Sequence, residues 1–127
     1  MLKKQEQEQE KEIKKEEFSL KESFVLWKET SKAGTNYLKG YITEGKIKLV
    51  GFYNTNKKNP KEPDIRIYNI NEEGKQDKEV CDLWETVSKS EKRYLNGKTD
   101  EDEKIIAFYN QENEEGTRPY IRAYFKD

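Results

Sequence analysis

An internal repeat constrains the fold of this chain more than any other feature. Residues 26–68 reappear, degraded but in register, at residues 83–124. The offset is 57 residues up to Gly97 and 56 residues from Lys104 onward, so one residue is missing from the turn between them. Such a repeat predicts one supersecondary unit used twice. The matching positions are Leu26-Trp27 with Leu83-Trp84, Ser31-Lys32 with Ser88-Lys89, Tyr37-Leu38 and Gly40 with Tyr94-Leu95 and Gly97, Phe52-Tyr53-Asn54 with Phe108-Tyr109-Asn110, and Pro63, Ile65-Arg66 and Tyr68 with Pro119, Ile121-Arg122 and Tyr124.

Composition indicates a thin core. Only 31% of the 127 residues are hydrophobic and 40% are charged, against about 45–50% and about 25% in ordinary globular domains. Each copy alone has about 45 residues, close to the roughly 40-residue limit below which a domain usually needs a disulfide or a metal. We therefore expect the two copies to pack together.

Four segments follow from the repeat. They are a charged N-terminal tail (1–22), a first β repeat (23–69), a linker (70–80) and a second β repeat (81–127). Residues 1–17 are low in complexity and rich in Lys, Glu and Gln, so this tail is expected to be helical or disordered.

Each repeat reads as four short strands separated by turn signals, which is typical of an antiparallel meander. In the first copy Gly34 supplies a turn, and Gly40 suggests a β-bulge. The predicted fold is mainly β: two tandem four-stranded antiparallel meanders packed as a pseudo-twofold β-sandwich or flattened barrel. The predicted strands are Phe24–Glu29, Asn36–Ile42, Ile47–Tyr53, Asp64–Asn69, Cys81–Val87, Arg93–Gly97, Lys104–Asn110 and Tyr120–Phe125.

Catalysis is not expected. The chain has no His, the commonest general base and metal ligand. Its one cysteine, Cys81, is predicted to be a small core residue, and a lone thiol fits a reducing cytoplasm. The Asp100–Glu103 run lacks the spacing of a calcium loop and reads as a solvated turn. We expect no cofactor, no metal, no membrane span and a cytoplasmic location.

The aromatic residues divide between two predicted roles. Trp27/Trp84, Tyr37/Tyr94 and Phe52/Phe108 are expected in the core. Since successive residues of a strand face opposite ways, Tyr53 and Tyr109 would then point to the other face. Exposed aromatic rings on a sheet can stack bases or anchor a protein partner. The candidates for an exposed face are Tyr53, Tyr68, Tyr109 and Tyr124.

Arg66 and Arg122 are retained in both copies of a chain with 21 Lys and 4 Arg. A guanidinium can clamp a carboxylate or a phosphate with two parallel hydrogen bonds. Two interpretations stay open: an ion pair within the fold, or a contact with an anion or nucleic acid.

The two copies differ in charge. Residues 25–69 hold nine basic and four acidic residues, whereas residues 81–127 hold eight basic and eleven acidic ones. The most basic stretch is the 54–63 loop with Lys57, Lys58 and Lys61. Such a loop is either simply solvated or touches phosphates or an acidic protein surface.

The first copy resembles small uncharacterised proteins of bacterial plasmids and phages that share a domain of unknown function. The residues that carry the resemblance are Trp27, Lys28, Ser31, Gly34, Tyr37, Leu38, Pro63, Asp64 and Arg66. The second copy departs from the pattern, since Glu91 replaces the turn glycine and Tyr120 replaces the aspartate. The resemblance implies a mobile-element context, and it assigns no activity.

Two functional hypotheses follow. In the first, the chain is a non-catalytic binding protein of a phage or mobile element that blocks a host protein, such as a CRISPR effector or another nucleoprotein defence nuclease. In the second, it binds single-stranded nucleic acid. A structural or assembly factor, as a homodimer, is a third reading. The predicted partner-binding residues are Tyr53, Lys57, Lys58, Lys61, Asp64, Arg66, Tyr68, Tyr109 and Arg122.

Overall fold

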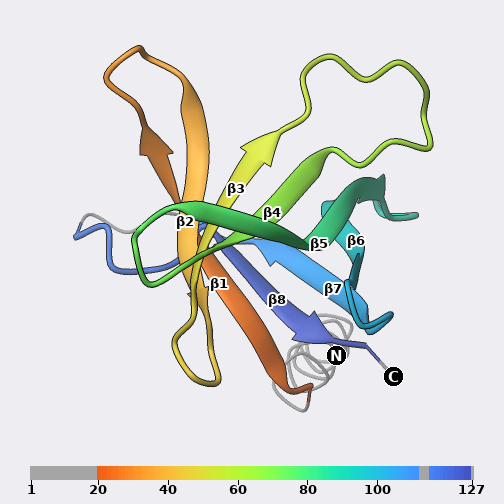
Figure 1. Ribbon diagram of the computed structural model, residues 1–127. Coiled ribbons are helices and arrows are strands. Elements are labelled where there is room, and N and C mark those ends of the chain that lie inside the picture. Colours follow the sequence, from red (N-terminus) through yellow and green to blue (C-terminus); the bar gives the residue numbers. More distant parts are fainter. Residues whose placement is uncertain (1–19, 112–114, 127) are drawn as a thin grey trace.

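The computed structural model describes residues 20–111 and 115–126. Within this part of the chain every regular element is a β-strand, and the strands form one closed antiparallel barrel in sequence order (Figure 1). The expected mainly β, antiparallel fold is confirmed, with the barrel rather than two separate sheets. The tail predicted to be helical or disordered lies almost entirely outside the described residues. The strands are β1 (Glu22–Thr30), β2 (Asn36–Ile42), β3 (Lys48–Tyr53), β4 (Ile65–Ile70), β5 (Gln76–Val87), β6 (Arg93–Thr99), β7 (Lys104–Tyr109) and β8 (Ile121–Phe125).

Pairing of the first strand with the last closes the barrel. Leu26 of β1 pairs with Ile121 of β8, and the ladder continues to the start of β1 with a register shift between Glu22 and Phe24. Between the two copies, β4 pairs with β5 through Ile65 and Leu83. The described sheet therefore has no free edge strand at which another chain could pair.

Most predicted strand boundaries hold to within one or two residues, but β5 begins early. It starts at Gln76, so the second half of the predicted 70–80 linker belongs to a strand. The connection between β4 and β5 is a tight turn in which the Gly74 N–H donates to the carbonyl of Asn71. The division of the chain into two repeat units remains a prediction.

Aliphatic side chains fill the barrel. One inward-facing layer consists of Leu and Ile side chains that are almost completely buried, as expected for a small barrel whose interior is packed rather than hollow. Small residues such as Ala107, Ala123 and Cys81 occupy other inward positions and leave room for them. The most deeply buried side chains are Leu26, Leu38, Leu49, Ile65, Ile67, Leu83, Leu95, Ile105 and Ile121.

Gly40 does not mark a bulge, contrary to the sequence-based expectation. It pairs in regular register with Leu26 on one side and Leu49 on the other. A Cβ atom at Gly40 would collide with the carbonyl oxygen of Val25, and one at Gly97 would collide with that of Asp82. These two glycines are required because neighbouring backbone approaches them closely.

The barrel has two ends. The long-loop end carries the connections β1–β2, β3–β4, β5–β6 and β7–β8. The terminal end carries the start of β1, the end of β8 and the connections β2–β3, β4–β5 and β6–β7. In Figure 1 the β1–β2 hairpin and the 54–64 loop rise at the top, while β8 ends near the bottom.

Candidate binding surfaces

The outer side of β2, β3 and β4 carries a row of aromatic rings. Tyr37 and Phe52 lie 6.4 Å apart, centroid to centroid, at an interplanar angle of 29°, and Phe52 and Tyr68 lie 6.0 Å apart. Phe52 is 38% exposed, a large value for a phenylalanine. The expectation that Tyr37, Tyr94, Phe52 and Phe108 are core residues is wrong, since these side chains lie on the outside of the barrel.

The reason is the strand register. Leu38 of β2 and Gly51 of β3 point inward and face each other in the ladder. Their neighbours Tyr37 and Phe52 must therefore point outward. The sequence shows alternation, but it does not show which of two apolar neighbours faces the core.

Cationic side chains are interleaved with this aromatic row. Lys39 pairs with Val50, which in turn pairs with Tyr68, and Phe52 pairs with Arg66. Lys48 follows on the same side of β3. We call this surface, formed by Tyr37, Lys39, Lys48, Phe52, Arg66 and Tyr68, the first aromatic face.

A second aromatic face occupies the matching strands of the other copy. Its rings are Tyr94, Phe108 and Tyr124, with Phe108 and Tyr124 at 6.2 Å. Here Asn96 stands where the first face has Lys39, so this face carries less positive charge.

Both retained arginines make ion pairs within the fold. Arg66 Nη1 lies 3.3 Å from Glu79 Oε1, and Arg122 Nη1 lies 3.6 Å from Glu22 Oε2. Each guanidinium remains partly exposed beside its aromatic face. The ion-pair interpretation is confirmed, and each Arg retains an exposed side toward solvent.

The two tryptophans lie outside the core, in contrast to the expectation. Both are half-buried, and each indole N–H reaches the backbone of a long loop. Trp27 Nε1 donates to the carbonyl of Thr117 at 3.3 Å, and Trp84 Nε1 donates to that of Lys61 at 2.9 Å. Each tryptophan thus holds a long loop of the other copy against the barrel wall: Trp27 holds the β7–β8 loop, and Trp84 holds the β3–β4 loop.

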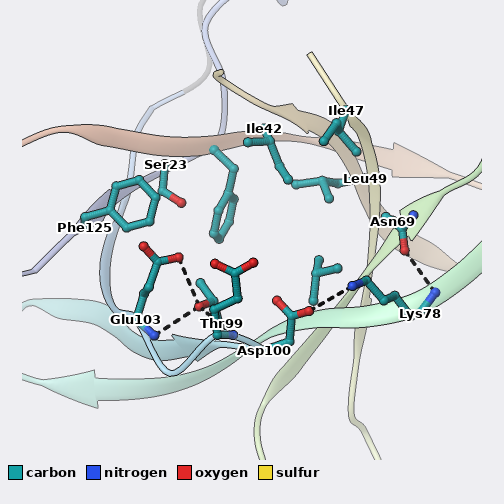
Figure 2. A pocket seen from close by; sticks show the side chains of 13 residues that line it. Ser23, Ile42, Ile47, Leu49, Asn69, Lys78, Thr99, Asp100, Glu103 and Phe125 are labelled. Atoms are coloured by element: carbon teal, nitrogen blue, oxygen red, sulfur yellow. Dashed lines mark hydrogen bonds and ion pairs between the residues drawn. The ribbon is translucent and has the colours of Figure 1, made fainter. Parts of the chain in front are cut away.

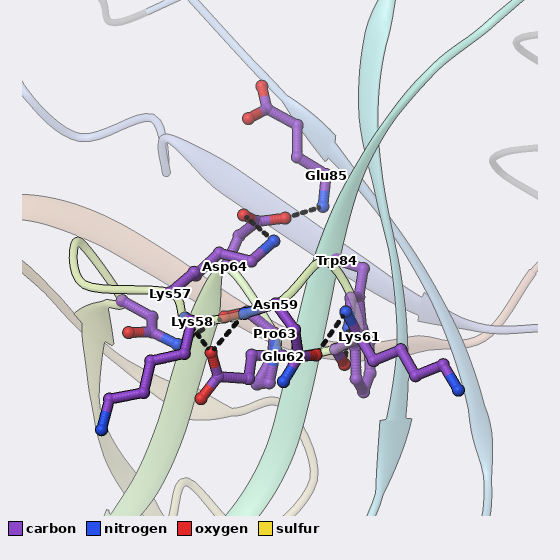
Figure 3. A network of polar contacts seen from close by, with 10 residues as sticks. Lys57, Lys58, Asn59, Lys61, Glu62, Pro63, Asp64, Trp84 and Glu85 are labelled. Atoms are coloured by element: carbon purple, nitrogen blue, oxygen red, sulfur yellow. Dashed lines mark hydrogen bonds and ion pairs between the residues drawn. The ribbon is translucent and has the colours of Figure 1, made fainter.

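The 54–64 loop is held by several polar contacts (Figure 3). Asp64 Oδ2 accepts the Glu85 N–H at 2.7 Å, and Asp64 Oδ1 lies 3.0 Å from Lys57 Nζ. The Glu62 carboxylate accepts the backbone N–H groups of Lys58 and Asn59. Lys57 and Asp64, predicted to bind a partner, therefore already bind each other.

Lys58 and Lys61 are different. Their side chains extend away from the loop in Figure 3. Neither ammonium group has an ion-pair partner within residues 20–111 and 115–126. These two lysines are the loop cations available to a partner.

Tyr53 and Tyr109 sit at the long-loop end, on the inward side of their strands. Tyr109 packs against the core and lies 5.3 Å from the ring of Tyr120. Lys28 Nζ lies 4.1 Å above the Tyr120 ring. Burial, and after it the charge of Glu85, raises the pKa of Tyr109, so this phenol stays protonated at any physiological pH.

The structure offers little support for chemistry at Cys81. The thiol is 4% exposed, in agreement with the predicted core role, and burial raises its pKa to about 12. A buried, protonated thiol is a poor nucleophile. Within the described residues no group of three or more His, Cys, Asp or Glu side chains could hold a metal ion.

The carboxyl group of Asp82 has an unusual environment that the sequence does not indicate. Its Oδ1 is buried and lacks a hydrogen-bond partner among the described residues. Burial, followed by the neighbouring Glu79 carboxyl, raises the pKa of Asp82 to about 7. Its pairing partner across β4–β5, Arg66, is engaged by Glu79.

Comparisons with known proteins do not place this chain. No family model matches it, and no curated protein and no solved structure proved significantly similar to it. Among the described residues there is no helix of the length and apolar character needed to cross a bilayer.

Proposed function

We propose that this chain is a non-catalytic binding protein of a phage or mobile element. It would block a host protein, such as a CRISPR effector or another defence nuclease, in the host cytoplasm. The observation that carries the proposal is the first aromatic face, where an exposed Phe52 lies between two tyrosines and pairs with Arg66 on the next strand. Aromatic residues and Arg are the residue types that dominate binding energy at protein interfaces.

The barrel suits this role because it is a rigid support. Its ladder is closed, so main-chain pairing is not available to a partner and recognition falls to outward side chains. The first copy is positively charged and the second negatively charged. Such asymmetry orients an acidic partner surface toward the first aromatic face and away from the second.

Reciprocal contacts support a pseudo-twofold relation between the copies. Trp27 reaches Thr117, while Trp84 reaches Lys61, which is the matching loop position of the first copy. The Arg66–Glu79 and Arg122–Glu22 pairs also exchange copies in this way. On this reading the two aromatic faces are equivalent scaffolds, of which the first carries one more cation, Lys39 in place of Asn96.

Paired variants test the proposal. Phe52→Ser with Lys39→Glu changes the first aromatic face, and Phe108→Ser with Asn96→Glu makes the matching change on the second. Each variant is first checked by thermal melting. Tagged protein then captures partners from a bacterial host lysate, with and without nuclease treatment.

We expect a protein partner that survives nuclease treatment, is retained by the second-face variant and is lost by the first-face variant. Competition by untagged wild-type protein must also remove it. Equal capture by both variants would place binding elsewhere on the molecule.

Single-stranded nucleic acid is the second candidate. The alternation of rings with Lys39, Lys48 and Arg66 favours it, since base stacking on aromatic rings and phosphate contacts with cations act together in such sites. The same variants decide between the two in an anisotropy titration with short DNA and RNA oligomers. Binding at about 50 mM salt that disappears in the first-face variant would support this candidate, and no binding at that salt would exclude it.

A further inference from the structure

A cavity of about 270 Å³ opens at the terminal end of the barrel (Figure 2). It lies where the aliphatic core stops. Its apolar wall is formed by side chains from five strands: Phe24, Ile42, Leu49, Val80 and Phe125. A cavity of about 150 Å³ is sufficient for benzene, so this one can hold an aromatic ring with a short chain attached.

Ser23 places a buried polar group in this wall. The residue is 5% exposed and lines the cavity. Its carbonyl accepts the Thr43 N–H, but its hydroxyl has no hydrogen-bond partner among the residues that the structure describes. Since the fully buried unpartnered atom in the described residues is Asp82 Oδ1, the Ser23 hydroxyl is accessible from the cavity, where a ligand group could hydrogen-bond to it. Figure 2 shows the Ser23 hydroxyl directed toward the cavity.

The rim of the cavity is acidic. The β6–β7 turn contributes Asp100, Glu101 and Glu103. Lys78 Nζ lies 3.2 Å from Asp100 and neutralises it. Glu101 and Glu103 have no cationic partner within the described ranges, so the rim keeps an excess of two negative charges.

Glu103 is fixed in place rather than loosely solvated. Its backbone N–H donates to Thr99 Oγ1 at 3.1 Å, and its carboxylate accepts the Thr99 hydroxyl at 3.4 Å. Carboxylates held at the mouth of an apolar cavity favour a cation there, because charge-assisted hydrogen bonds are about twice as strong as neutral ones.

We infer that this cavity binds a small arylalkyl amine. The aromatic ring occupies the apolar wall against Phe24 and Phe125. The ammonium group lies at the rim beside Glu101 and Glu103 and donates a further hydrogen bond to the Ser23 hydroxyl. The dimensions and the apolar lining accommodate an aromatic ring with a short chain, and the net negative charge of the rim selects an amine over a carboxylate or a neutral alcohol of equal size.

A titration of the full chain followed by ¹H–¹⁵N NMR tests the inference. The probes are 2-phenylethylamine, 2-phenylethanol and 3-phenylpropionate, which share one ring and differ in end group. We expect amide shifts at Ser23, Thr99 and Phe125, with the amine bound about tenfold more tightly than the alcohol and the carboxylate weakest. The preference for the amine should shrink as salt is raised.

Two variants separate the parts of the site. Glu101→Gln with Glu103→Gln should reduce the affinity for the amine to that for the alcohol. The matched control, Glu29→Gln with Glu91→Gln, removes two exposed carboxylates at the long-loop end and should leave binding unchanged.

Ser23→Ala provides a readout that a purely structural role would not give. It should weaken amine binding several-fold, while the midpoint of unfolding stays constant because the Ser23 hydroxyl makes no side-chain hydrogen bond in the free protein. No shifts up to about 10 mM amine, equal binding of all three probes, or shifts confined to the long-loop end would each overturn the inference.

Discussion

Asp82 on β5 stands at the position that corresponds to Val25 on β1. Val25 is 4% exposed, covered on the outside of the barrel. Asp82 is half-buried, and its buried Oδ1 has no hydrogen-bond partner in the described part of the chain. A titratable carboxyl group therefore occupies a partly desolvated position that an apolar side chain fills in the first copy.

Stability should therefore depend on pH through Asp82. Its pKa is raised from 3.8 to about 7 on folding, so the folded state binds this proton more tightly than the unfolded state does. The contribution of Asp82 is most favourable below pH 4, is lost progressively as pH rises to 7 and is constant above that.

Asp82→Asn and Asp82→Val should remove this loss. We expect both variants to be more stable than wild type at pH 8 by about 1 kcal/mol, the lower range for an unsatisfied buried group. Urea unfolding at pH 4.5 and pH 8 measures the difference in stability between each variant and wild type. The control is Glu72→Gln, which changes an exposed turn residue. A gain equal at both pH values would show that the Asp82 charge is not the cause.

Glu91 and Gly34 occupy matching turns with unequal strain. Both turns have the same hydrogen bonds, from Gly34 N to Ser31 O and from Glu91 N to Ser88 O, each at 2.9 Å. Glu91 nevertheless adopts φ = 63°, a conformation that favours glycine. Glu91→Gly should stabilise the protein by about 1 kcal/mol, and Gly34→Glu should destabilise it by a similar amount.

Thermal melts of these two variants check the pair. The reciprocal design controls for side-chain loss at the surface. If both substitutions destabilise the protein, the Glu91 side chain stabilises the folded state by more than its backbone strain costs.

Gly40 and Gly97 should not tolerate a side chain. Gly40→Ala and Gly97→Ala place Cβ against strand backbone, which cannot move without breaking the ladder, so each should cost about 3 kcal/mol or more. Gly51→Ala is the matched control, because there Cβ meets the Leu38 side chain at 3.3 Å. Urea unfolding ranks the three variants by stability. An equal loss of stability for Gly51→Ala and Gly40→Ala would contradict the conclusion that neighbouring backbone requires glycine at position 40.

Asp64 should matter for stability more than its partner Lys57 does. Asp64→Ala leaves the Glu85 N–H without its acceptor at 2.7 Å, which should cost about 1.5–3 kcal/mol. Lys57→Ala removes only a partly exposed ion pair, worth about 1 kcal/mol or less. Denaturant unfolding of both variants and of Lys58→Ala separates these roles. Equal losses for Asp64→Ala and Lys57→Ala would assign the effect to the ion pair instead.

The sequence was a good guide to strands and turns. β2 was located without error, because Asn36–Ile42 lies between two turn signals, one at Gly34 and one at Gly45. Cys81 was correctly assigned to the core, since a lone cysteine without a histidine partner behaves as a small apolar residue. The candidate lysine loop was also recognised, but not the Asp64 contact to β5, which joins residues 21 positions apart.

The repeat and the alternation of side chains determined the number of strands, their antiparallel order and the matching of the two copies. Only the tertiary structure decided which alternate face is inside. That choice depends on barrel closure: with Leu26 opposite Gly40 and Leu38 opposite Gly51, the narrow interior takes aliphatic and small residues and leaves the larger rings outside. Each aromatic face lies on three consecutive strands, and closure decides only that its rings point outward. The cavity at the terminal end depends on the tertiary structure alone, because it is formed by strands distant in sequence.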